Sequence, residues 1–75
     1  MSNIGSWDFC IRAAQCINRI AGQAVYRAIG RRVIYELQLR CSDGGGLARY
    51  PSDEEVLEVI ELIKKEMTYC GTEQA

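Results

Sequence analysis

A long apolar stripe with the period of an α-helix constrains the first part of the chain more than any other feature. Successive helical residues are about 100° apart, and at this spacing the apolar side chains from Trp7 to Ile29 gather on one half of the helical wheel. The stripe keeps its phase through Gly22, so the sequence predicts one helix over residues 7–29, preceded by a loose tail over residues 1–5. A break at Gly22 is the alternative.

Capping signals mark the end of this helix and the start of another. Gly30 suits the left-handed conformation in which many helices end. Further along, Ser52 and Glu55 have the spacing of a capping box, in which each side chain satisfies a free backbone N–H group near the other. The apolar period that follows predicts a second helix over residues 53–69, with a loose tail over residues 71–75.

The segment between the two helices alternates apolar and polar residues, which is the period of a β-strand. This alternation predicts a strand over residues 32–41. Residues 42–46 are rich in glycine and are expected to turn the chain into a short return strand over residues 47–50. The alternative is a helical stripe formed by Val33, Ile34, Leu37 and Cys41.

Together these elements predict a single α+β domain of 75 residues in the order helix, strand, strand, helix. In this α-β-β-α arrangement, two helices pack against a two-stranded antiparallel hairpin. Such a hairpin is marginal on its own, and a chain this short has a small core, so we expect a homodimer to complete the fold. If residues 32–41 are helical, the alternative is an all-α hairpin or bundle.

The composition argues against most familiar catalytic and metal sites. The chain has no histidine, which is the commonest general base and metal ligand, and its four cysteines form no paired zinc-binding motif. We therefore expect no enzyme activity, no cofactor and no metal. The sequence contains no apolar run long enough to span a membrane and no recognisable signal peptide. These features predict a cytoplasmic protein, without a membrane partner, whose cysteines are thiols.

Charge is unevenly distributed, although the formal net charge is only −1. Residues 1–50 carry seven arginines and three acids, a net charge of +4, whereas residues 51–75 carry two lysines and seven acids, a net charge of −5. Arginines near the expected hairpin suit phosphate binding, so the alternative function is a nucleic-acid-binding domain. The opposing interpretation is that they are solvated or paired with the acidic second helix. These arginines are Arg27, Arg31, Arg32, Arg40 and Arg49.

Two pairs of apolar residues lie outside the centre of the predicted stripes. Leu62 and Tyr69 are seven residues apart on the polar side of the second helix, and Phe9 and Cys16 have the same spacing at the edge of the first stripe. Apolar residues in such positions can mark an interface with another protein. The sequence therefore favours a small cytoplasmic protein-interaction module, an accessory regulator or inhibitor that occupies a surface of its protein partner.

Overall fold

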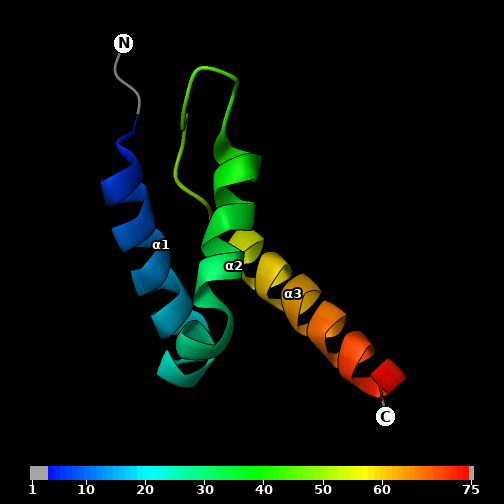
Figure 1. Ribbon diagram of the computed structural model, residues 1–75. Helices are drawn as coiled ribbons and strands as arrows, with labels where there is room; N and C mark the ends of the chain where they lie inside the picture. Colours follow the sequence, from blue (N-terminus) through cyan, green and yellow to red (C-terminus); the bar gives the residue numbers. More distant parts are fainter. Residues whose placement is uncertain (1–3, 75) are drawn as a thin grey trace.

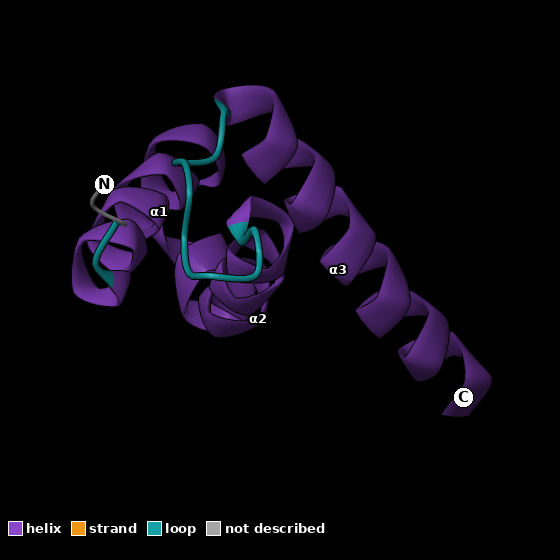
Figure 2. Cartoon of the chain, turned by 90° about the horizontal axis from the view of Figure 1, so that it is seen from above, coloured by secondary structure: helices purple, strands orange, loops and turns teal. Residues whose placement is uncertain are grey.

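Over the residues that the structure describes, the protein is a bundle of three α-helices. The computed structural model describes the backbone of residues 4–74 and the side chains up to residue 67. The helices are α1 (Ser6–Ala21), α2 (Gln23–Cys41) and α3 (Asp53–Gln74). α1 and α2 form an antiparallel hairpin, and a loop leads from the end of α2 to the start of α3 (Figure 1). α3 packs on one side of this hairpin and then extends away from it, so the molecule measures 50 × 25 × 19 Å (Figure 2).

The prediction of an α-β-β-α domain is wrong, and the alternative of an all-α bundle is correct. Within residues 4–74 the structure contains no β-strand, and Leu47 makes isolated bridges with Ile4 and Ser42 in place of a hairpin. Residues 32–41 belong to α2, and residues 47–50 belong to the loop. The open hairpin that a second copy was expected to complete is therefore not part of this fold.

Residues 32–41 are helical because the helical spacing serves the core better than strand alternation does. Val33, Leu37 and Cys41 are one turn apart, and all three are buried between the other two helices. Alternation would have buried Tyr35 and Leu39 on the same face, but both side chains are exposed. A helix also satisfies its backbone groups internally, whereas a two-stranded hairpin leaves two open edges.

The helix predicted over residues 7–29 is two helices that meet at Gly22. Gly22 has φ 98° and ψ 162°, a conformation essentially restricted to glycine. Its N–H group donates to the carbonyl of Asn18 at 3.0 Å and closes α1, while its carbonyl accepts from the N–H group of Tyr26 at 3.2 Å and opens α2. The apolar stripe does not reveal this break, because α1 and α2 each carry an apolar face that is buried in the core.

Gly30, which was expected to end the first helix, lies in the middle of α2. A Cβ atom at this position would come within 2.6 Å of Cδ1 of Tyr26. Because Gly30 has no side chain, the Tyr26 ring can lie against the backbone of α2 at Gly30, one helical turn after Tyr26. This glycine serves side-chain packing and not capping.

The core fills the space between the three helices. Each helix contributes one apolar row, and Leu47 from the loop closes one end. Phe9 is fully buried and stacks on the ring of Tyr50, with 6.3 Å between the ring centroids. Burying a large apolar side chain contributes about 1.5–3 kcal/mol, so this core is the main source of stability. It consists of Phe9, Ala13, Cys16, Ile17, Ile29, Val33, Leu37, Cys41, Leu47, Val56, Val59, Ile60 and Ile63.

α3 starts at the capping signal but continues further than predicted. The Ser52 hydroxyl accepts a hydrogen bond from the N–H group of Glu55 at 3.2 Å. The Glu55 carboxylate pairs with Arg49 and does not return to Ser52, so half of the capping box is formed. The helix also runs past residue 69 and includes most of the tail predicted over residues 71–75.

Replacing Gly22 tests the break between α1 and α2. Because φ is positive at this position, Gly22→Ala should lower the free energy of unfolding by about 1–3 kcal/mol in urea denaturation followed by circular dichroism. A continuous helix would respond in the opposite direction, since alanine would stabilise its interior by up to about 1 kcal/mol.

Gly45→Ala is the matched control for this substitution. Gly45 is exposed, its φ is not positive, and an added Cβ would lie 3.9 Å from the Asp43 carboxylate, which is an ordinary contact. Its effect should stay within about 0.5 kcal/mol. A Gly22→Ala protein that is as stable as the wild type, or more stable, would contradict the break.

Candidate interaction surface

The contact between α1 and α2 has a core side, which α3 covers, and an outer side, which it does not (Figure 2). Between the two, the side-chain amide of Gln38 donates to Sγ of Cys10 at 3.4 Å. Both residues are partly buried. This hydrogen bond lies on the line where α1 and α2 meet outside the core. We call this line the seam, and Cys10 and Gln38 are its residues in α1 and α2.

Large apolar side chains flank the seam on its outer side. In each helix, one of them stands three residues before the seam residue and the other stands one residue after it. The seam residue is Cys10 in α1 and Gln38 in α2. These offsets turn a side chain about 60° and 100° around the helix, away from the core in both cases. We call these four residues the outer patch: Trp7 (76% exposed), Ile11 (42%), Tyr35 (63%) and Leu39 (55%).

A shallow depression lies at one end of the outer patch, where the start of α1, the end of α2 and the loop meet. Ser6 at the start of α1 lines it together with Tyr35 and Leu39 of α2, so the two helices share one surface here. Along the seam, Cys10 and Ala14 of α1 are small and partly buried.

The sequence patterns placed all four outer-patch residues inside the core. Trp7 and Ile11 belong to the helical stripe, and Tyr35 and Leu39 belong to the apolar side of the expected strand. The apolar stripe of α1 is wider than the surface that α2 and α3 cover, so one edge of it stays exposed. A helical interpretation of residues 32–41 would have revealed Tyr35 and Leu39 as lying outside the Val33 row.

Among the residues predicted to form a partner interface, those whose side chains the structure describes do not share one exposed surface. Phe9 is fully buried and Cys16 is 8% exposed, so both belong to the core. Leu62 is 41% exposed on α3, and the Tyr69 side chain lies outside those that the structure describes. Among the described members of this set, Leu62 alone has the exposure that an interface requires.

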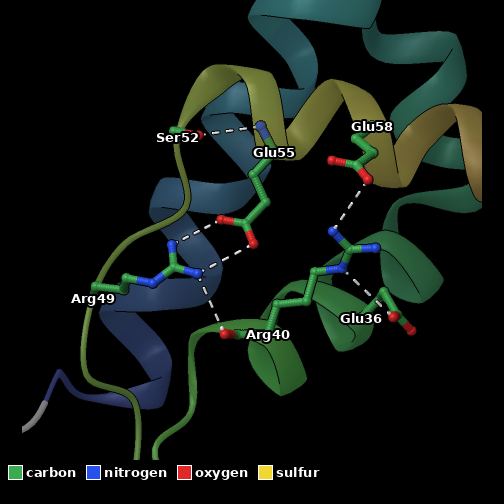
Figure 3. A network of polar contacts seen from close by, with 6 residues as sticks. All are labelled: Glu36, Arg40, Arg49, Ser52, Glu55 and Glu58. Carbon is green, nitrogen blue, oxygen red and sulfur yellow. Dashed lines mark hydrogen bonds and ion pairs between the residues drawn. The ribbon is translucent and has the colours of Figure 1, made fainter.

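Two of the arginines predicted to bind nucleic acid form a network with acidic residues (Figure 3). Arg49 donates to the two carboxylate oxygens of Glu55 at 2.8 and 3.3 Å, and to the carbonyl oxygen of Arg40 at 3.4 Å. The guanidinium of Arg40 lies 3.7 Å from Glu36 and 3.8 Å from Glu58. The network therefore ties the end of α2 and the loop to the first turns of α3.

The other three arginines of the predicted cluster differ in their partners. Arg32 pairs with Glu66 of α3 at 3.2 Å. Arg27 and Arg31 are exposed and have no acidic partner among the described side chains. Arg27 stands eleven residues before Gln38, and Arg31 stands seven residues before it. Both spacings are close to whole numbers of helical turns, so the two arginines lie on the same side of α2 as Gln38. Arg27, Arg31 and Arg32 nevertheless line one depression on α2, whereas Arg40 and Arg49 belong to the network with Glu55 and Glu58.

A third polar contact joins α1 to the start of α3 beside the buried thiol of Cys16. Arg19 donates two hydrogen bonds to the Asp53 carboxylate, at 2.9 and 3.2 Å, and the Cys16 thiol donates a third at 3.2 Å. The bonds from Arg19, and then that from Cys16, lower the pKa of Asp53. Burial and the adjacent carboxylate raise the pKa of Cys16, so the thiol stays protonated and is a poor nucleophile. This cluster is a structural contact.

Comparisons of the chain with models of protein families, with curated proteins and with solved structures found no match. In the described part of the chain, no three cysteine or acidic side chains are grouped so as to hold a metal ion. None of the described helices combines the length and the apolar character needed to cross a bilayer. The outer patch and the two arginines beside it, Arg27 and Arg31, are the exposed groups without a partner among the described side chains in this part of the molecule.

The Arg49–Glu55 pair predicts how stability depends on acid. The hydrogen bonds from Arg49 lower the pKa of Glu55 below its ordinary value of 4.5. A carboxylate with a lowered pKa in the folded state contributes stability that is complete above the unfolded-state pKa and is lost as the pH falls through the folded-state pKa. Glu55→Gln should therefore cost about 1 kcal/mol at neutral pH. Its difference from the wild type should shrink between about pH 5 and pH 3.

Urea denaturation at three pH values measures this effect, with Glu58→Gln as the control. Glu58 also faces an arginine, but at 3.8 Å and with 65% of its side chain exposed, whereas the Glu55 side chain is 16% exposed. The control should lose less than about 0.5 kcal/mol. Equal losses for both variants, or a Glu55→Gln effect that does not change with pH, would argue against the pair.

Proposed function

We propose that this protein is a small protein-interaction module that binds its partner through the outer patch. The observation that carries the proposal is the exposure of four large apolar side chains on adjoining faces of two packed helices. Single apolar residues are common on protein surfaces, whereas a contiguous apolar patch marks a binding surface. Tryptophan and tyrosine are also enriched among the residues that dominate binding energy, and the patch contains one of each.

The proposed mode of action is occupancy, as an accessory regulator or inhibitor in the cytoplasm. The patch lies on helices that the core holds in place, so it is presented in a defined shape. The polar side chains that line the depression at the patch are Ser6, Gln38 and Ser42, and none of them is an ordinary general base, which favours binding over catalysis. The free thiols of Cys10, Cys16 and Cys41 suit a reducing compartment.

Nucleic acid is the second candidate partner, and the arginine contacts weigh against it. Phosphate binding draws on several basic side chains at once. Arg32, Arg40 and Arg49 are engaged by acids of α3, and those acids would repel a phosphate backbone. Arg27 and Arg31 are left, and they adjoin an apolar patch. The surface therefore favours a protein partner.

A double substitution in the outer patch tests the proposed function. Immobilised tagged protein should retain a discrete protein from a lysate of its source cells, with and without nuclease. Tyr35→Asp combined with Leu39→Asp should lower the recovery at least about tenfold, because charge is then buried at the centre of the interface. Circular dichroism should be unchanged, since both side chains lie outside the core.

Leu62→Asp is the matched control, because Leu62 is an exposed leucine on α3 and does not belong to the outer patch. It should retain the partner at the wild-type level. Retention by the Tyr35→Asp, Leu39→Asp variant would remove the outer patch from consideration, and loss in Leu62→Asp alone would move the interface to α3. Recovery that disappears with nuclease would favour the nucleic-acid alternative.

A further inference from the structure

The outer patch continues along α2 into a basic region. Arg31 stands one turn before Tyr35, and Arg27 stands one turn before Arg31. From Leu39 to Arg27 the surface is about 18 Å long, at 1.5 Å per residue. One end of this surface is therefore apolar, and the other carries two exposed guanidinium groups. We call the whole surface, including the outer patch, the outer face.

The two arginines of the outer face differ from the rest in having no partner among the described side chains. The guanidinium of Arg12 lies 4.5 Å from the centre of the Tyr50 ring. The other arginines outside the outer face each pair with an acidic side chain. The acids of α1 and α2 are Asp8 and Glu36, and Glu36 is engaged on the α3 side by Arg40. The basic end of the outer face thus has an unmatched positive charge.

We propose that the outer face receives an acidic amphipathic helix from a partner protein, an inference that rests on the proposed function. Helices commonly bind in grooves through apolar residues three or four positions apart. The outer face requires such residues over about two turns, to contact Trp7, Ile11, Tyr35 and Leu39. It then requires two acids one turn apart, opposite Arg31 and Arg27. The charges set the direction in which the helix lies and speed its association.

The same observations decide against the other occupants. The outer face itself carries no acid, so a second copy that presented the same face would place arginines or apolar side chains opposite Arg27 and Arg31. An anionic lipid surface would match the charge, but it is flat on this scale. The depression that Ser6, Tyr35 and Leu39 line makes the apolar end of the outer face concave. A concave apolar end followed by two guanidinium groups fits a helix that carries apolar side chains and acids.

Two synthetic helical peptides of about 18 residues, long enough to cover the outer face, test the proposal. Both carry leucines at helical spacing, and one carries glutamates where the other carries lysines, opposite Arg31 and Arg27. Fluorescence anisotropy should show that the glutamate peptide binds the wild type about tenfold or more tightly than the lysine peptide. Arg27→Glu combined with Arg31→Glu should reverse this preference, because the charge then matches the lysine peptide.

Lys64→Glu combined with Lys65→Glu is the matched control. It changes the net charge by the same amount, at two exposed positions of α3. This variant should keep the wild-type preference for the glutamate peptide, and circular dichroism should show that every variant is folded. Reversal of the preference in this control would show that overall charge, and not the outer face, controls binding.

The remaining outcomes separate this inference from the proposed function. Equal binding of both peptides would overturn the acidic helix and leave the outer patch as an apolar interface. Failure of both peptides, together with a dimer in sedimentation that Tyr35→Asp and Leu39→Asp abolish, would identify a second copy as the occupant. Failure of both, together with binding to phosphatidylglycerol vesicles that Arg27→Glu and Arg31→Glu abolish, would identify a lipid surface. Failure of all three probes would also overturn the inference, whereas the proposed function depends on the lysate experiment.

Discussion

The reversal of the chain at Gly22 creates the α1–α2 hairpin, and with it the side that forms the core and the side that carries the outer patch. Without it, the apolar stripe from Trp7 to Ile29 would be one helix about 35 Å long with no neighbour to cover it. With it, α2 returns along α1, and the hairpin acquires a side that α3 covers and a side that it leaves open. The backbone conformation at this one position is open to glycine and strained for other residues. The core and the outer patch are consequences of the same local geometry.

The uneven distribution of charge along the chain follows from the way α3 packs. Its acids meet arginines of α1, α2 and the loop, and the described ion pairs between these parts join basic residues before Pro51 to acidic residues after it. Most of these groups are exposed, and each exposed pair contributes at most about 1 kcal/mol. The apolar row from Val56 to Ile63 therefore holds α3 in place, and the ion pairs favour one register.

Hydrophobic periodicity predicts a helix well where the apolar residues fit the helical period alone, and poorly where they also fit the alternation of a β-strand. The capping signal at Ser52 and the stripe after it placed the start of α3 correctly, because local backbone groups decide that position. Residues 32–41 fit both periods, and the choice depended on packing against α1 and α3, which the sequence alone does not display. The predicted interface residues Phe9 and Cys16 proved buried for the same reason. The pairing of arginines with the acidic second helix could be anticipated from charge, but the exposure of Trp7 could not.

The projection of α3 beyond the other helices changes how the molecule moves in solution. A compact chain of this length would have a radius of gyration of about 11 Å, whereas this one has 13.2 Å. An elongated monomer experiences more friction than a sphere of the same mass, so it elutes early from a gel-filtration column and tumbles at different rates about its long and short axes. Its apparent size on a column would therefore resemble that of a larger compact protein, and the state of association has to be read from mass and not from elution volume.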